Sequence, residues 1–201
     1  MTGTWPEADV DDRTLDRLFR QARTHNGWTD RPVTGAMVRT LYDLAKWGPT
    51  TANSSPGRFV FVRSAPAKAR LIPHINAGNI DKVTRAPCTV IIAGDTRFYE
   101  EYATLFPSRN MRSLFEGEDA LSTETVARSS TLQGAYLIMA ARALGLDCGP
   151  MSGFDAAGVD EEFFPDGRWK ANFLCNIGYG RPAALHPRNP RLDFDTACLD
   201  L

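Results

Sequence analysis

WGPTTANSSP, residues 47–56, stops a helical pattern abruptly and replaces it with short polar side chains. Gly48 and Pro49 prevent the preceding helix from continuing. The residues after them carry hydrogen-bonding groups on short stems, which lose little rotamer entropy when a ligand orders them. Asn53 both donates and accepts, and so suits a heterocycle whose edge alternates N–H and C=O groups. An ordinary polar turn has the same composition, so this stretch alone does not separate a ligand-binding loop from a turn.

Outward from this loop, hydrophobic spacing predicts several helices and strands. We expect helices that begin near Asp12, Thr34, Ser64, Thr123 and Asp155 and strands over residues 59–62, 89–93 and 173–177. The first helix should end near Arg23, and Gly145 should end the one over residues 123–144. Because helices and strands do not alternate regularly, the predicted fold class is α+β, in a single domain over residues 1–201. A chain of this length buries about 70% of its unfolded surface, enough for one core.

Three regions lack a regular period. Residues 98–117 mix aromatic residues with arginines, and we predict a short helix plus an irregular excursion of the size that often covers a ligand. Residues 149–154, GPMSGF, read as a second glycine-rich turn. Residues 182–190 are predicted to form an extended arm.

Small residues in the helix predicted over residues 123–144 would let another helix approach closely, as at a subunit interface.

Composition excludes several classes of function. The chain has 23 Lys and Arg against 24 Asp and Glu, so no strong field favours nucleic acid or an anionic membrane. The longest apolar run, residues 135–141, is far shorter than the roughly 20 residues that span a bilayer. The N-terminus has no basic segment followed by an apolar stretch. We therefore expect a cytoplasmic enzyme or binding protein.

Familiar motifs for metals, phosphate loops and nucleophiles are missing from the sequence. The four cysteines are widely spaced with no Cys-x-x-Cys pair, and the three histidines lie far apart. We therefore predict no metal site and buried free thiols. The Tyr-x-x-x-Lys spacing of Tyr42 and Lys46 is a weak signal, because it only places both side chains on one helix face.

Basic and amide residues recur at three loops, over residues 23–26, 79–82 and 188–192. A phosphomonoester carries about −1.5 to −2 charges near neutral pH, and a guanidinium fork matches its oxygens. Arg23 and Arg191 could supply two such groups if the loops converge. Any one of these arginines, taken alone, reads as a solvated surface charge.

Four segments, in this order, resemble the nitroreductase family. They are Arg23-Thr24-His25-Asn26-Gly27-Trp28, the loop from Gly48 to Pro56, Gly149-Pro150-Met151-Ser152-Gly153-Phe154, and Gly178-Tyr179-Gly180 followed by Pro190-Arg191-Leu192. Within that family, nearly all of residues 15–201 is similar to the RutE-like malonic semialdehyde reductase subgroup.

The resemblance implies an FMN-binding fold with a mixed sheet flanked by helices. It also implies an intertwined homodimer that holds FMN at its interface, with terminal arms wrapped around the partner. Arg23 and Arg191 would bind the phosphate, with His25 as a further donor. Many family members carry a second basic residue at the position of Gly27. In this chain, binding of the phosphate would therefore depend more on Arg191 and Arg188.

The resemblance also places residues around the flavin ring. Lys82 would favour the negative charge that reduction leaves near flavin N1 and O2. The backbone of Gly153 would face N5, where the chemistry occurs, and no catalytic side chain is assigned. The remaining ring and ribityl contacts would come from Thr50, Thr51, Asn53, Ser55, Asn79, Pro150 and Ser152. Purely structural roles are the alternatives for these residues. Asn79 would cap a turn, Lys82 would be a solvated surface charge, and Gly149 and Gly153 would shape a loop.

By resemblance, NADPH or NADH would reduce FMN, and the flavin would then reduce a small acceptor in a ping-pong cycle. The expected acceptor is malonic semialdehyde (3-oxopropanoate), giving 3-hydroxypropanoate in pyrimidine catabolism. An arginine should meet its carboxylate, and Arg58, Arg109 and Arg112 all remain candidates. The alternatives are a broad nitroaromatic or quinone reductase and a protein that stores FMN without turnover.

Overall fold

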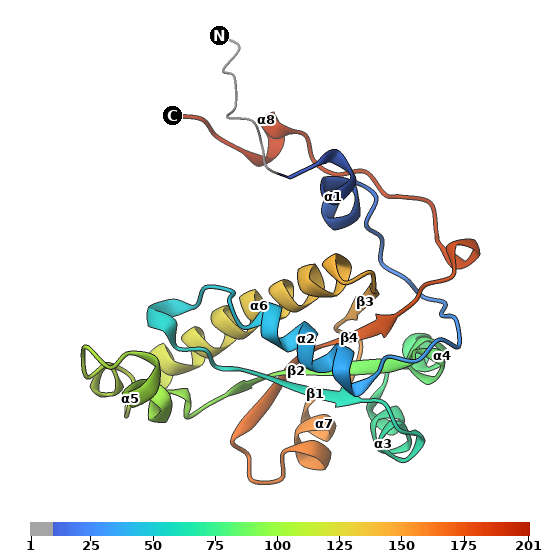
Figure 1. The fold of residues 1–201 in the computed structure, drawn as a ribbon. Helices are drawn as coiled ribbons and strands as arrows, with labels where there is room; N and C mark the ends of the chain where they lie inside the picture. The colour runs from blue at the N-terminus through green and yellow to red at the C-terminus, as the bar shows by residue number, and fades with distance from the viewer. Residues whose placement is uncertain (1–9) are drawn as a thin grey trace.

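Four strands form one sheet at the centre of the protein, in the order β1-β2-β4-β3 (Figure 1). The structure is a computed structural model that describes residues 10–201. The strands are β1 (Gly57–Val62), β2 (Cys88–Asp95), β3 (Asp147–Met151) and β4 (Trp169–Gly178). Where the resemblance predicted a mixed sheet, these strands pair antiparallel throughout. A parallel contact occurs as an isolated bridge between Thr24 and Cys148.

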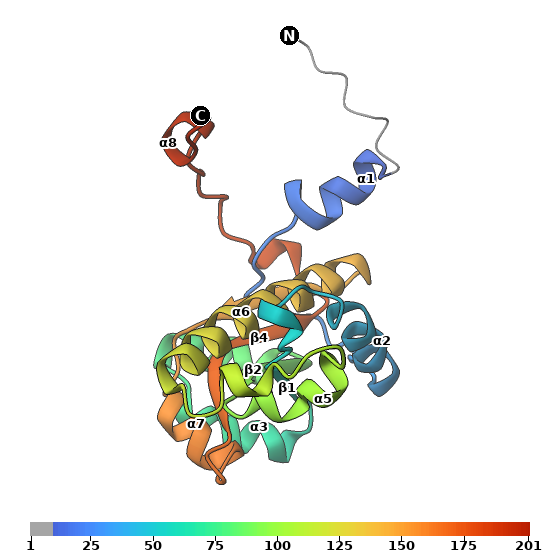
Figure 2. The same ribbon diagram turned by 90° about the vertical axis from the view of Figure 1, so that its left-hand side faces the viewer.

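Both faces of the sheet are covered by helices, which explains why β2 is buried along its whole length. Val90 and Ile92 pack under α2 (Gly35–Ala45) and α6 (Asp119–Ala143). Ile91 and Ala93 pack on the other face, under α3 (Ala65–Leu71), α4 (Ile80–Arg85) and α7 (Ala156–Phe163). Figures 1 and 2 show these two layers on either side of the strands. The predicted α+β class is confirmed.

Three predicted helix starts are confirmed by their caps. The side chains of Thr34, Ser64 and Asp155 each accept a hydrogen bond from a backbone N–H in the first turn of α2, α3 and α7. The first helix is shorter than predicted, since α1 (Asp12–Leu15) passes into a π-helical turn, η1 (Asp16–Arg20). Short 3₁₀ turns and helices make up the rest: η2 (Thr51–Asn53), η3 (Ile72–His74), η4 (Ala77–Asn79), η5 (Phe98–Glu101), α5 (Tyr102–Leu105), η6 (Arg112–Leu114), η7 (Pro182–Ala184) and α8 (Phe194–Ala197).

The predicted glycine-rich turn over residues 149–154 is partly wrong, because Gly149, Pro150 and Met151 belong to β3. A Cβ atom at Gly149 would lie 2.5 Å from the carbonyl oxygen of His25, so glycine is needed where the N-terminal segment crosses the strand. Proline is tolerated at the next position because β3 lies at the edge of the four-stranded sheet. Only residues 152–154 form the turn.

The two terminal segments leave the sheet on the same side of the molecule and carry α1 and α8 away from it (Figures 1 and 2). The predicted arm over residues 182–190 starts with the turn η7 and is irregular after it. Cys88, Cys148 and Cys175 are buried as predicted. Cys198 is exposed, contrary to the prediction, because it follows α8 in the C-terminal segment that leaves the sheet.

The sequence predicted neither a metal site nor a membrane-spanning segment, and the structure can be compared with these two predictions over the described residues. Residues 10–201 contain no cluster of side chains suited to a metal ion. No helix in this range is long and apolar enough for a membrane crossing. Residues 1–9 of the predicted 1–201 domain lie outside the described residues.

Candidate functional site

Three predicted phosphate-binding arginines meet where the N-terminal segment crosses the C-terminal arm. Arg23, Arg188 and Arg191 line a cavity of about 300 Å³. The Arg23 guanidinium donates to the carbonyl of His186, and Arg188 Nη2 donates to the carbonyl of Ala22 at 2.9 Å. These reciprocal hydrogen bonds hold the two segments together.

Among residues 10–201, no carboxylate neutralises the charge of this arginine cluster. Arg191 Nη1 donates to two nearby backbone carbonyls, at 3.0 and 3.1 Å. Within residues 10–201, neither Arg23, Arg188 nor Arg191 has a carboxylate partner. An anion with several oxygens, such as a phosphate, would complete the site.

A fourth arginine of this cavity was not predicted. Arg142, in the last turn of α6, lines the same cavity, and its Nη1 donates to the carbonyl of Leu18 at 3.0 Å. Its Nε is buried without a partner among the described residues. In the sequence, an arginine at the end of a long helix is explained by its favourable interaction with the helix dipole. No local pattern could have distinguished it.

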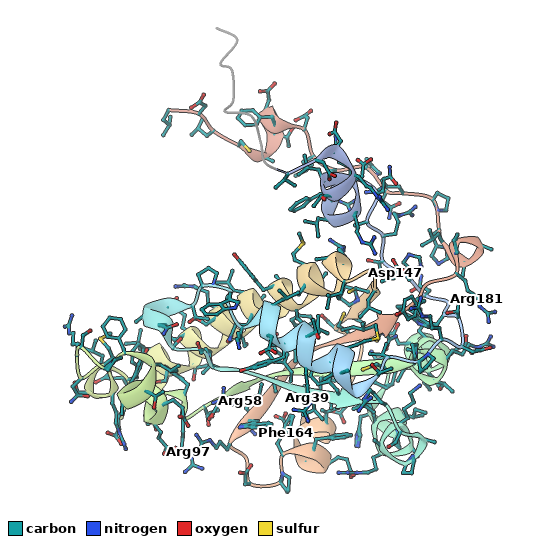
Figure 3. All side chains as sticks on the ribbon, in the orientation of Figure 1. Arg39, Arg58, Arg97, Asp147, Phe164 and Arg181 are labelled. Carbon is teal, nitrogen blue, oxygen red and sulfur yellow. The ribbon has the colours of Figure 1, made fainter. Side chains whose placement is uncertain are left out.

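His25 occupies a different place from the arginines. Only 7% of it is exposed, and its Nε2 lies 3.4 Å from Asp147 Oδ1. Burial lowers the pKa of His25, the Arg23 charge lowers it further, and Asp147 opposes both. Asp147 stands where the terminal segments meet the sheet (Figure 3). His25 does not line the arginine cavity, and its role as a phosphate donor stays a prediction.

A second predicted group does come together, at the other end of β3. Lys82 Nζ donates to Asn79 Oδ1 at 3.0 Å, and Asn79 Nδ2 donates to the Gly153 carbonyl at 3.1 Å. A Cβ atom at Gly153 would lie 2.6 Å from Asn79 Nδ2, so a larger residue there would displace the Asn79 amide from this position. Pro150 and Ser152 are exposed beside this group.

The strand β3 links these two groups. Thr24 bridges Cys148 near the arginine cavity, and Ile75 bridges Phe154 beside Asn79. Five residue steps lead from Cys148 to Gly153, which is roughly 16 Å of extended chain. The spacing suits an elongated ligand with an anionic group at one end and a polar ring at the other.

The loop over residues 50–55 is held in a strained shape, unlike an ordinary turn. Ala52, Asn53 and Ser55 have φ angles of 49°, 54° and 41°, in the left-handed region that glycine prefers. Ser129 Oγ accepts from the backbone N–H of Thr51 at 3.2 Å, and Thr50 Oγ1 accepts from that of Ser55 at 3.1 Å. Strain of this kind clusters at ligand-binding sites.

This loop lies far from Asn79 and Lys82 within one chain. The loop precedes Gly57, which pairs with Gly94 near the end of β2, whereas α4 precedes Cys88 at its start. The six steps between those β2 positions span roughly 20 Å. Figure 1 shows the loop and α4 at opposite ends of the sheet. One chain therefore does not bring together all the predicted ring contacts.

The sequence matches the profile of the nitroreductase family over residues 19–179. It is 65% identical over 187 residues to a Rhodopseudomonas palustris protein provisionally named NADH dehydrogenase/NAD(P)H nitroreductase, covering 93% of this chain and 95% of that protein. A Ralstonia nicotianae protein with the same type of provisional name is 56% identical, covering 92% and 94%.

Two solved structures share the fold. One is a provisionally named nitroreductase from Exiguobacterium sibiricum in complex with FMN, with a TM-score of 0.81, 21% identity, and coverage of 95% of this chain and 98% of that one. The other is CLA-ER, an enone reductase of gut-bacterial fatty acid saturation, with a TM-score of 0.83, 20% identity, and coverage of 96% and 99%.

Proposed function

The chain belongs to the nitroreductase family, and on this premise we propose that it is an FMN-dependent oxidoreductase that takes electrons from NADPH or NADH. The observation that carries the proposal is the pairing along β3 of an unneutralised arginine cavity with the Lys82–Asn79–Gly153 group. When bound, FMN supplies the hydride chemistry that couples oxidation of the nicotinamide to reduction of the acceptor.

The arginine cavity and the Lys82–Asn79–Gly153 group have different roles in FMN binding. Arg23, Arg188 and Arg191 hold the phosphate by charge-assisted hydrogen bonds. Lys82 places a cation where reduction adds negative charge, and a partly dry site strengthens that interaction. Asn79 fixes the position of the Lys82 ammonium and of the Gly153 backbone. The protein contributes orientation and electrostatics rather than a nucleophile.

A homodimer completes this site in our proposal. The strained loop over residues 50–55 and the Lys82 group lie at opposite ends of the sheet within one chain, so a loop from a second copy supplies the missing ring contacts. Exposed apolar residues near this loop support such contact, since Trp47 is 78% exposed and Tyr136 is 41% exposed. Tyr136 packs against Gly48, where a Cβ atom would lie 2.6 Å from its ring.

The acceptor we propose is malonic semialdehyde. Its reduction adds a hydride to the aldehyde carbon and a proton to the oxygen, which gives 3-hydroxypropanoate. Support comes from the resemblance of residues 15–201 to the malonic semialdehyde reductase subgroup. A broad nitroaromatic reductase is the second candidate, which the provisional names of the relatives favour.

Mixed dimers test the shared site. Asn53→Ala and Lys82→Met subunits carrying different affinity tags are co-expressed, and the doubly tagged species is purified. If each site takes its loop from one subunit and its lysine from the other, the mixed dimer contains one intact site and regains activity over both parent variants. A mixed dimer no more active than its parents would contradict the proposal.

Turnover of two acceptors separates the candidate functions. Rates with malonic semialdehyde and with a nitrofuran are compared for NADPH and for NADH. A markedly higher kcat/KM for malonic semialdehyde supports the first candidate, and the reverse supports the second. Bleaching of the yellow protein by NADPH without steady-state oxidation by any acceptor would instead indicate flavin storage.

A further inference from the structure

Residues 98–117 contain the predicted short helix, α5, flanked by the turns η5 and η6, and the segment is packed around its own aromatic residues. Phe98, Tyr102, Met111 and Phe115 are buried together. The ring of Phe115 lies 5.1 Å from that of Phe98 and 5.6 Å from that of Tyr102, between ring centroids. This cluster gives the excursion a core of its own and therefore a fixed shape.

The excursion is joined to the strained loop over residues 50–55. Asn53 Nδ2 donates to the carbonyl of Leu105 at 2.8 Å, and Ala52 packs against the aromatic cluster. Burial raises the pKa of Tyr102, whose ring belongs to the same aromatic cluster. The loop and the excursion are therefore in direct contact, and whatever lies against Asn53 also lies near the excursion.

A cavity of about 400 Å³ opens on this excursion. It is lined by the aromatic residues Tyr99, Tyr102 and Phe106, and by the polar residues Arg109, Asn110 and Arg112. Glu100 also lines the cavity, but its carboxylate pairs with Arg168 at 3.0 Å. The cavity combines apolar walls with a small number of polar groups, as ligand sites do.

The structure separates the three arginines that the sequence left as equal candidates. Arg58 Nη2 pairs with the buried Asp95 at 2.7 Å. Arg112 pairs with Glu116, and its guanidinium lies 6.0 Å from the centre of the Tyr99 ring. Arg109 is exposed, and among the described residues its guanidinium has neither an ion pair nor a hydrogen bond.

We propose that Arg109 binds the carboxylate of the acceptor, which makes small oxo acids the substrate class of this enzyme. The inference rests on the proposed function, since it concerns the acceptor of the same flavin site. The reduced nicotinamide supplies the two electrons, the carbonyl carbon receives the hydride, its oxygen receives a proton, and the product is a hydroxy acid. Arg109 is a specificity residue in this scheme, because it holds the end of the acceptor that does not react.

The test compares Arg109→Gln and Arg109→Lys with Arg97→Gln as a matched control. Arg97 is exposed at the start of the same excursion, and its side chain makes no ion pair within residues 10–201. Malonic semialdehyde is compared with propanal, a neutral aldehyde of the same length. A charge-assisted hydrogen-bond pair predicts a loss of kcat/KM of about 10- to 100-fold for Arg109→Gln with malonic semialdehyde only, mainly through KM. Arg109→Lys should recover part of it, because the charge remains without the fork.

Binding of malonate by isothermal titration calorimetry gives a readout that does not depend on turnover. The holoprotein should bind malonate at least ten times more weakly after Arg109→Gln and unchanged after Arg97→Gln, as expected for loss of a charged hydrogen bond. An equal loss of kcat/KM with both aldehydes would overturn the proposal, as would a malonate affinity that is unchanged by Arg109→Gln. A wild-type protein that retains no FMN would overturn the proposed function instead, and the spectrum shows this before any variant is made.

Discussion

Lys82 Nζ donates a hydrogen bond of 3.0 Å to Asn79 Oδ1. Asn79 in turn holds the Gly153 carbonyl at 3.1 Å, so the ammonium is fixed relative to the backbone of the turn after β3. The two residues are three positions apart at the start of α4, which brings their side chains together on one face. A mobile surface lysine is thereby converted into a positioned charge.

Replacing Lys82 with methionine should make the bound flavin harder to reduce, because the developing negative charge loses its cation. We expect a midpoint potential about 30 mV more negative, corresponding to about 1.4 kcal/mol for a two-electron couple. Spectroelectrochemistry of the FMN-loaded protein measures the shift. Lys46→Met is the control, since Lys46, the residue just after α2, pairs with Asp43 of that helix at the surface. Equal shifts in both variants would contradict a specific role for Lys82.

Gly153→Ala should weaken FMN binding. The added methyl group would meet Asn79 Nδ2 at 2.6 Å and push the amide away from the turn. Gly78→Ala is a close control, because a Cβ atom at Gly78 meets nothing within 4 Å. Fluorescence titration of the apoproteins with FMN should give a Kd raised about tenfold for Gly153→Ala, as for the loss of one charge-assisted or buried hydrogen bond. Similar Kd values for the two variants would show that the close approach is unimportant.

The main elements of this fold were predictable because their signals are local. Thr34, Ser64 and Asp155 marked helix starts by the capping chemistry of single residues. The strand at Gly149 was missed because glycine and proline usually mark turns. Here Gly149 lets a distant segment cross the strand, and Pro150 is tolerated at the edge of the sheet. Pairing between distant segments leaves no local pattern.

The site was predictable to a different extent. Polar loops identified the Asn53 and Asn79 segments, and the structure shows that Asn79, Lys82 and Gly153 meet. The sequence did not distinguish Arg58, Arg109 and Arg112 as candidates for binding the acceptor carboxylate. The distinction depends on which arginine already pairs with a carboxylate of the protein. Arg142 was missed for a different reason, since only the fold brings the end of α6 to the arginine cavity.

Arg191→Ala should loosen FMN more than Lys46→Ala does. Arg191 contributes a guanidinium without a carboxylate partner in the described part of the chain to the cavity that we assign to the phosphate. Loss of one charge-assisted contact predicts a rise in Kd of about 10- to 100-fold. Flavin retained after exhaustive dialysis is the measurement. Equal retention by the two variants would count against the phosphate assignment.

The buried carboxylate of Asp95 joins three segments of the chain. Its side chain is 1% exposed, and it pairs with Arg58 of β1 at 2.7 Å and with Arg168 before β4 at 2.9 Å. Burial alone would raise the pKa of Asp95. The hydrogen bond from Arg168, the backbone N–H of Arg97 and the two guanidinium charges outweigh burial, and the pKa falls below its usual value of 3.8.

Asp95→Asn should therefore destabilise the protein by about 3 kcal/mol at neutral pH, the lower end for a broken buried pair because both arginines are partly exposed. The pKa of Asp95 is lower in the folded state, so its contribution is fully present above the usual value of 3.8 and is lost as pH falls through the folded-state value. Urea unfolding of wild type and variant should give a constant difference in unfolding free energy from pH 7 to about pH 5, and a shrinking one below about pH 4. A difference that is small at neutral pH, or that grows in acid, would show that the Asp95 ion pairs do not stabilise the junction of β1, β2 and β4.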